Sequence, residues 1–141
     1  KEKFGISNKI LFLGHRSYFE IPTYLRAADV LVLPNKKGSL VSERYTSPMK
    51  LFEYMGSGRP IVVSRLPSAE EIVGDSDCFF FEPNDSEDLA RVIMQVANDP
   101  FEAERRSVRA KEEVARYTWP MSALTMVQWM NSWLQLYDKR S

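Results

Sequence analysis

The sequence has few residues that could bind a metal ion or cross-link the chain. Its 141 residues include one cysteine, Cys78, and one histidine, His15. A single cysteine excludes an internal disulfide and a cysteine-built zinc site, and a single histidine argues against a histidine metal cluster. We therefore expect no metal, no bound cofactor and a cytosolic protein.

The sequence also lacks an excess of charge of one sign and any long apolar run. The 19 Lys and Arg residues balance the 19 Asp and Glu residues, which argues against binding to nucleic acid or to an anionic membrane surface. No apolar run approaches the roughly 20 residues of a membrane span, and the start, "KEKFGISNK", has no signal-peptide pattern. That start resembles the tail of a helix from which an upstream segment has been removed. Any anion site must be local.

Short apolar runs divide the chain. With 44% hydrophobic and 27% charged residues, the chain fits one globular domain with a real core. The runs have the length and the β-branched and aromatic content of buried strands, and helix-like segments alternate with them. This alternation predicts an α/β fold with a parallel, doubly wound sheet. The predicted strands are 9–14, 30–34, 60–64 and 78–82, and the predicted helices are 19–28, 47–55, 67–73 and 86–97.

Two helix starts carry capping patterns that support this division independently. "SAEE" reads as a capping box that pairs Ser68 with Glu71. "NDSEDLA" places Asp85 or Ser86 at the N-cap of the following helix.

The last 40 residues predict two more helices. Residues 101–117 carry mixed charge with few apolar positions, which indicates a solvated helix packed by one narrow edge. From Pro120 onward the apolar residues share one wide arc of a helix. We favour packing of this arc against the rest of the domain, then against a partner domain, and last against a membrane surface, because the polar arc has no lysine stripe. The arc contains Met126, Trp129, Met130, Trp133, Leu134, Leu136 and Tyr137.

The loops after the predicted strands are where chemistry is expected, because ligands of open parallel sheets bind beyond the carboxyl ends of the strands. These loops are "GHRS", "PNKKGSLVSERYTSP", "SRLPS" and "EPNDS". The second is unusually long for a loop in a compact domain, which indicates a functional or mobile segment. It also concentrates positive charge, in Lys36, Lys37 and Arg44.

The helix that follows this loop, in "SPMKLFEYMGSGRP", begins in a way suited to anions. Ser47 is a good N-cap and Pro48 fits the first helical position, so the amides of Met49 and Lys50 can bind a phosphate, assisted by the helix dipole. Glu53 lies on the face opposite the sheet, roughly 7 to 8 Å along the axis from Pro48. That offset fits a carboxylate that binds the ribose hydroxyls of a nucleotide.

A simpler interpretation remains open for each of these residues. Glu53 and Lys50 could form an exposed i, i+3 ion pair worth a few tenths of a kcal/mol. Gly56 and Gly58 are first of all helix terminators, and only second glycines that allow close approach of a ligand.

Four segments together carry a family resemblance. "FLGHRSYFEIPTYLRAADVLVLP", "SPMKLFEYMGSGRP", "IVVSRLPSAEEIV" and "FEPNDSEDLARVIMQVANDP" occur in the order and spacing of the C-terminal, nucleotide-sugar-binding half of GT-B glycosyltransferases. The chain resembles glycosyltransferase family 4, also called group 1, over residues 9–119. The resemblance implies a Rossmann-like donor-binding domain over 1–119 and a helix over 120–141 that packs on a missing N-terminal domain.

The resemblance also implies roles for individual residues. In that family the second of two glutamates separated by seven residues binds the donor ribose, and Glu53 matches it. Tyr45 stands at the first position, which contacts the donor sugar, and Glu43 is two residues out of register. The diphosphate contacts map to the amides around residues 47–51: Ser47, Pro48, Met49, Lys50 and Leu51. Thr46, beside Tyr45, is also expected in the donor site. Gly14 and His15 match the loop that contacts the base.

The function that the resemblance implies is transfer of a sugar from a nucleoside-diphosphate sugar to a glycan, lipid or small-molecule acceptor, with retention at the anomeric carbon. The acceptor would bind to the missing N-terminal domain, and the isolated chain would be inactive. The full-length protein would be cytoplasmic or lie at the inner membrane surface. The alternatives are a GT-B nucleotide-sugar epimerase and a non-catalytic, degenerate GT-B subunit, which Tyr45 favours.

Overall fold

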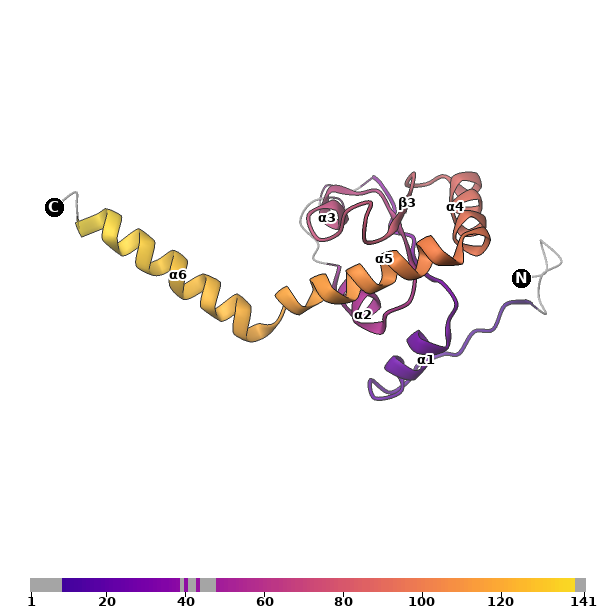
Figure 1. Cartoon of the computed structure of the whole chain (residues 1–141), viewed down its shortest axis with the longest axis horizontal. Helices are drawn as coiled ribbons and strands as arrows, with labels where there is room; N and C mark the ends of the chain where they lie inside the picture. The colour runs from indigo at the N-terminus through magenta and orange to yellow at the C-terminus, as the bar shows by residue number, and fades with distance from the viewer. Residues whose placement is uncertain (1–8, 39, 41–42, 44–47, 139–141) are drawn as a thin grey trace.

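The computed structural model describes residues 9–38, 40, 43 and 48–138 of the chain. Three strands alternate with helices along it (Figure 1). In chain order the elements are α1 (Ile21–Ala27), β1 (Leu31–Leu33), α2 (Met49–Ser57), β2 (Ile61–Ser64), α3 (Pro67–Glu70), β3 (Phe79–Phe81), α4 (Ser86–Asn98), α5 (Pro100–Glu113), the 3-10 helix η4 (Val114–Arg116) and α6 (Trp119–Asp138).

The strands form a parallel sheet in the order β1-β2-β3, with Val32 beside Val62 and Val63 beside Phe80. All four residues of the central strand β2 are buried. Ile61 and Val63 pack with residues of α2, α3 and α5, whereas Val62 packs on the other face with residues of α4. Helices therefore cover both faces, and the predicted doubly wound α/β fold with a parallel sheet is confirmed.

The predicted strand over 9–14 is not formed. Residues 10–13 have irregular backbone, and Leu11 and Phe12 are 81% and 74% exposed. A strand requires a neighbouring strand for its backbone hydrogen bonds and a layer to cover its side chains. In the described part of the chain no strand pairs with this segment, so its apolar composition alone does not make it a strand. The sheet has three described strands instead of the predicted four.

The helix termini agree with the sequence in part. Asp85 is the N-cap of α4, and its side chain accepts hydrogen bonds from the amides of Glu87 and Asp88. The predicted capping box at Ser68 is wrong, because α3 begins one residue earlier, at Pro67, with Leu66 as an N-cap that makes no side-chain bond. Gly58 ends α2 in the left-handed conformation, with φ of 71°.

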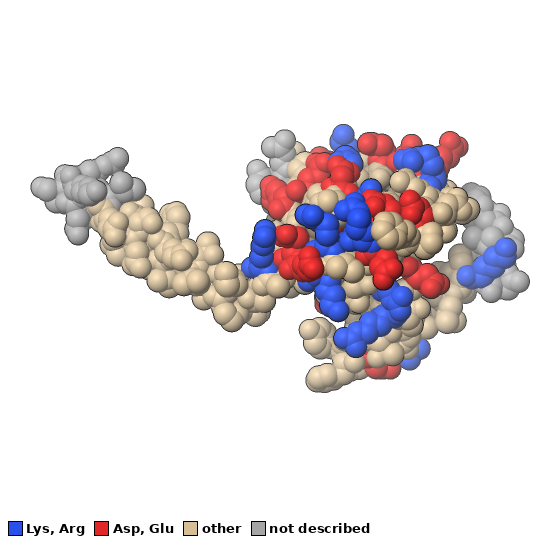
Figure 2. Space-filling view, viewed as in Figure 1, with Lys and Arg blue, Asp and Glu red and all other residues tan. Residues whose placement is uncertain are grey.

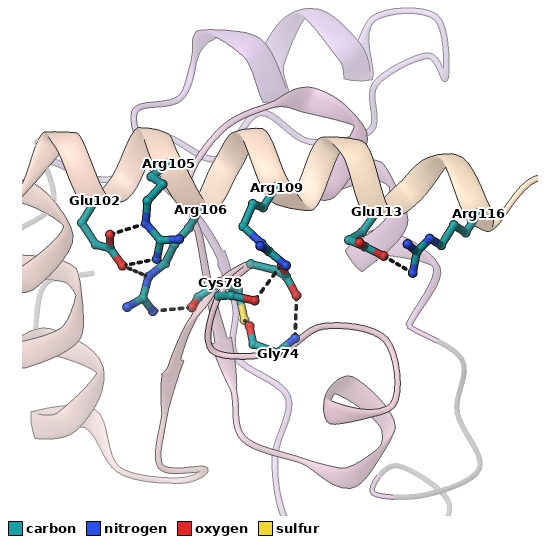
Figure 3. Close-up of polar contacts among 10 residues, drawn as sticks. Gly74, Cys78, Glu102, Arg105, Arg106, Arg109, Glu113 and Arg116 are labelled. Atoms are coloured by element: carbon teal, nitrogen blue, oxygen red, sulfur yellow. Dashed lines mark hydrogen bonds and ion pairs between the residues drawn. The ribbon is translucent and has the colours of Figure 1, made fainter.

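Helix α5 packs by a narrow edge of small buried residues, Ala103, Ser107 and Ala110, as the sequence predicted. The face beside this edge carries a series of charged contacts, some of which reach the segment around Cys78 (Figure 3). Arg106 donates to the carbonyl oxygen of Cys78 at 2.7 Å and lies 4.1 Å from the ring centroid of Phe79. These contacts fasten α5 to the start of β3.

Glu102 accepts hydrogen bonds from both Arg105 and Arg106, and these bonds lower its pKa from 4.5 to about 2. Because the pKa of Glu102 is lower in the folded chain than its ordinary value of 4.5, the ionised carboxylate stabilises the fold fully at a pH above 4.5. This stabilisation is lost as the pH falls towards about 2. We expect Glu102→Gln to flatten the fall in melting temperature below about pH 5, measured by circular dichroism. Glu104→Gln is the control. If the melting temperature of Glu102→Gln fell with pH as steeply as that of the wild type, the ion pairs of Glu102 would not stabilise the fold.

Helix α6 projects away from the sheet and its helices (Figure 1). Every residue of α6 whose exposure is described is exposed, and Trp119, Trp129 and Trp133 are 88%, 67% and 54% exposed. Residues 119–137 contain no charged residue, and Figure 2 shows them as an uncharged arm. The expectation that this helix packs on its own domain is wrong, because its described side chains are exposed. Just before α6, the ring of Tyr117 contacts Phe52.

Within the described residues, no helix has the length and apolarity to span a membrane.

Candidate functional site

Helix α2 presents different residues to the sheet and to solvent. Leu51 and Met55 are fully buried in the core, whereas Glu53 is exposed on the other side of the helix. Phe52 packs against the edge of the core. This division follows from the helical spacing, so the buried pair fixes the direction in which Glu53 points.

Among the described residues, no side chain caps the start of α2. The helix begins at Met49 with Pro48 at the N-cap, so the prediction that Pro48 occupies the first helical position is wrong. The predicted N-cap, Ser47, lies outside the described residues, as do Tyr45 and Thr46. The first turn contains no acidic residue, and Met49 and Lys50 are exposed. An uncapped, exposed helix start with a lysine in its first turn favours an anion.

A cavity of about 190 Å³ lies between α1 and α2, with Glu53 in its wall. The carboxylate of Glu53 makes no hydrogen bond or ion pair with any described residue. The exposed i, i+3 ion pair with Lys50, itself a described residue, was the simpler interpretation of Glu53 and is therefore not formed. Its charge adds to the effect of burial in raising the pKa of Tyr54. The cavity is lined by Tyr18, Ile21, Pro22, Leu25 and Arg26 on one side and by Glu53, Gly56 and Ser57 on the other.

The structure brings only part of the predicted site together. Gly14 has a left-handed φ of 69°, which favours glycine, and His15 is exposed. Neither lines the cavity, whereas Tyr18, three residues further along, does. Glu43, the out-of-register acid, accepts a hydrogen bond from the Gly38 amide at 2.8 Å.

Sequence reasoning missed the contribution of α1 to the cavity, which includes Leu25 and Arg26. The signal that could have found it is the turn before α1, where the aromatic residue Tyr18 follows the polar residues 15–17. That turn marks a possible wall of the site but does not specify how α1 packs beside α2.

Two other candidate groups are occupied or inert. Arg65 follows β2, but its guanidinium is bound by Glu70 at 3.1 Å and Asp75 at 2.7 Å. Burial raises the pKa of Cys78 to about 12, so its thiol stays protonated. In the described ranges no group of three or more acidic, histidine or cysteine side chains could hold a metal ion.

A second hollow, of about 410 Å³, lies at the amino ends of β1 and β2. It contains Asp29, Arg59 and Glu104 among its lining residues. Since Val30 and Pro60 precede the strands, this hollow is at the end of the sheet opposite the start of α2.

Comparison with known proteins gives the class of protein first. The chain has the α/β fold of GT-B glycosyltransferases. Anabaena HepE in complex with UDP and glucose superposes with a TM-score of 0.74 and 21% identity, over 95% of this chain and 34% of that one. Sucrose-phosphate synthase from Thermosynechococcus elongatus gives a TM-score of 0.73 and 22% identity, over 96% of this chain and 33% of that one. Likeness at this level of identity shows the fold.

The family follows from the sequence. The model of glycosyl transferases group 1 matches residues 1–113, and the chain belongs to this family. It is 24% identical to D-inositol 3-phosphate glycosyltransferase of Corynebacterium urealyticum, over 90% of this chain and 28% of the relative. It is 28% identical to the Escherichia coli UDP-Gal:alpha-D-GlcNAc-diphosphoundecaprenol alpha-1,3-galactosyltransferase, over 67% of this chain and 22% of the relative. The chain spans less than a third of either relative.

Proposed function

We propose that this chain is the donor-binding, C-terminal part of a retaining glycosyltransferase of family 4. The observation that carries the proposal is the Glu53 carboxylate, which has no partner among the described residues and lines the cavity between α1 and α2. It lies about one helical turn beyond the uncapped start of α2. An anion site and a carboxylate at this separation suit the diphosphate and the ribose of a nucleotide.

In the proposed complex the amides of Met49 and Lys50 face the diphosphate, with the Lys50 ammonium nearby. The Leu51 amide follows them and donates to the Pro48 carbonyl at 2.7 Å. Ser47 and Pro48 precede them, and Tyr45 and Thr46 lie towards the donor sugar. Gly14 and His15 contact the base from the loop before α1. Two structures of one neighbour, HepE, support a nucleotide-sugar donor, since they are described as complexes with UDP and with UDP-glucose.

The chemistry of the proposed enzyme is hexosyl transfer without a metal or cofactor. The bond between the anomeric carbon and the diphosphate oxygen breaks, and the nucleoside diphosphate leaves. The oxygen of an acceptor hydroxyl forms the new bond on the same face, and the proton of that hydroxyl passes to the leaving phosphate oxygen. The uncapped amides at the start of α2 would stabilise the charge that develops on the leaving group. The acceptor, a glycan, lipid or small molecule, would bind to another domain, so the isolated chain binds donor weakly and transfers no sugar. The full-length protein would act in the cytoplasm or at the inner membrane surface.

A nucleotide titration tests this proposal. Calorimetry with UDP, GDP and ADP on the 141-residue chain should give saturable binding of at least one of them, competed by its nucleotide sugar and not by the corresponding nucleoside. The nucleoside control isolates the contribution of the diphosphate. Absence of binding by all three at millimolar concentration would contradict the proposed function.

We also propose that residues 120–141 pack on the N-terminal domain of a longer protein, apart from the donor-binding domain of residues 1–119. The exposed tryptophans of α6 support this proposal. Truncation after Thr118 removes α6, whose described side chains are exposed, so the free energy of unfolding of the α/β domain should change little. The melting temperature should stay within about 1 °C of the wild-type value, which corresponds to a change of about 0.2 kcal/mol. A clear fall would show that α6 stabilises its own domain.

A degenerate, non-catalytic subunit is the second candidate function, and the tyrosine at position 45 favours it. Assay of the full-length protein with a panel of nucleotide-sugar donors separates the two, because a degenerate subunit would bind donor without transferring sugar.

A further inference from the structure

One peptide group of the loop after β1 is hydrogen-bonded on both of its sides. The side-chain amide of Asn84 donates to the Lys37 carbonyl oxygen at 3.0 Å. The Gly38 amide, which belongs to the same peptide group, donates to the Glu43 carboxylate at 2.8 Å. Glu43 is part of the loop itself, whereas Asn84 lies 47 positions after Lys37, just before α4. The peptide group between Lys37 and Gly38 is therefore held by two side chains from different parts of the chain.

The backbone has a positive φ at both ends of the contact with Asn84. Gly38 has φ of 135°, which favours glycine, and Asn84 has φ of 66°. Among the non-glycine residues that the structure describes, Asn84 alone has a positive φ. Asparagine adopts this conformation more readily than most residues. Position 84 thus combines an unusual backbone conformation with a side chain that donates to the neighbouring loop.

The turn that carries Asn84 is ordered by its own helix. The Asp85 amide donates to the Glu82 carbonyl at 3.2 Å, and the Glu82 amide donates to the Asp88 carboxylate at 2.7 Å. Because this turn follows β3 and the contacted loop follows β1, the hydrogen bond from Asn84 joins the carboxyl ends of the two outer strands of the sheet. A fixed turn at one outer strand therefore supports the loop at the other.

The supported loop leads into the candidate site. Four residues separate Glu43 from Pro48, the N-cap of α2. A chain spans at most roughly 3.5 Å per residue, so holding Glu43 against Gly38 limits the positions from which the chain can enter the helix. A loop that is ordered before a ligand binds loses less conformational entropy on binding, and the ligand binds more tightly.

We infer that Asn84 and Glu43 are positioning residues of the donor site, which hold one peptide group of the loop and so order the chain that leads into α2. This inference rests on the proposed function and adds two residues that act through the loop without touching the nucleotide. Glu43 therefore does not take the place of the sugar-contacting glutamate of the family, whose position Tyr45 occupies.

Calorimetry on the 141-residue chain tests the inference, with the nucleoside diphosphate that the wild type binds among UDP, GDP and ADP. Asn84→Gly allows the same φ and removes the donor, so it should weaken binding by about fivefold, the effect of one net hydrogen bond. Glu43→Ala should have a similar effect, whereas Glu43→Gln keeps an oxygen for the Gly38 amide and should restore most of the affinity. Asn98→Gly, at the exposed far end of α4, is the matched control and should bind normally.

Two further measurements separate positioning from direct contact. If Asn84 and Glu43 act through one peptide group, the variant with both Asn84→Gly and Glu43→Ala should lose about fivefold, instead of the roughly 25-fold loss of two independent changes. In the free chain, Asn84→Gly should speed hydrogen exchange of the Gly38 amide, although it leaves the acceptor of that amide in place. A glutamate that touched the donor sugar would weaken binding of the sugar conjugate, such as UDP-glucose, and leave nucleoside-diphosphate binding unchanged.

The failures of the two proposals are distinguishable. If the wild type binds nucleotide and Glu53→Ala weakens binding while Asn84→Gly and Glu43→Ala do not, the positioning inference is overturned and the proposed function stands. Independent losses in the double variant, or a loss for Glu43→Ala confined to the nucleotide sugar, would also overturn the inference. If the wild type binds no nucleotide, the proposed function fails and this inference fails with it.

Discussion

Replacement of Met55 by alanine is expected to lower the free energy of unfolding by about 2 to 5 kcal/mol. Met55 is 0% exposed and packs in the cluster that joins α2 to the sheet, with Leu51, Val63 and Cys78. Truncation removes its apolar contacts and leaves a cavity that the packed strands cannot close. For a domain whose total stability is of the order of 5 to 15 kcal/mol, this is a large part of the total.

Urea unfolding followed by circular dichroism measures this effect, and the same helix provides the control. Met49 is 66% exposed, so Met49→Ala should change stability by less than about 0.5 kcal/mol. Equal losses for the two variants would contradict the packing of α2 described above. Because Met55 and Leu51 anchor the helix that carries Glu53, a destabilised Met55→Ala chain should also bind nucleotide less well as the temperature rises.

Replacement of Glu53 by alanine is expected to weaken UDP binding by about 10- to 100-fold, as expected for the loss of hydrogen bonds to a charged acceptor. The carboxylate has no described partner in the free chain, so its removal breaks no contact that stabilises the fold. The variant should therefore unfold as the wild type does. Glu112→Ala, which removes an exposed carboxylate from α5, is the matched control and should bind UDP normally.

A second ligand shows whether the ribose is the group that Glu53 binds. The wild type should bind 2′-deoxy-UDP more weakly than UDP, whereas Glu53→Ala should bind the two almost equally. Combining the side-chain change with the ligand change isolates the contact between the Glu53 carboxylate and the 2′-hydroxyl of the ribose. If the penalty for the missing hydroxyl is the same in both chains, Glu53 does not bind that hydroxyl, even if its removal weakens binding.

The parts of the fold that depend on local chemistry could be predicted from the sequence. The buried runs that became β1, β2 and β3 are apolar except for Ser64, because both faces of a parallel sheet are covered. Asp85 was found as a helix cap because a short carboxylate before an amphipathic run satisfies free amides. At Ser68 the same reasoning failed, since Pro67 had already fixed a helical φ and started the helix one residue earlier.

The features that depend on distant partners could not be predicted. The run at 10–13 and the apolar arc of α6 have the composition of buried segments, yet the described chain offers no layer to cover either of them. The candidate site also combines a feature set within one segment with a feature that depends on packing between segments. Glu53 could be proposed from helical geometry within one segment, whereas its proximity to Tyr18 depends on how α1 packs beside α2. No spacing in the sequence reports that contact.

The most direct test of the donor-binding proposal is to locate UDP on the chain by amide NMR during a titration. The largest shifts are expected in the first turn of α2, at Met49 to Leu51, and in the turn of residues 17–19, and Glu53→Ala is expected to reduce both sets together. Shifts confined to the hollow at the other end of the sheet, around Arg59 and Pro60, would contradict the account.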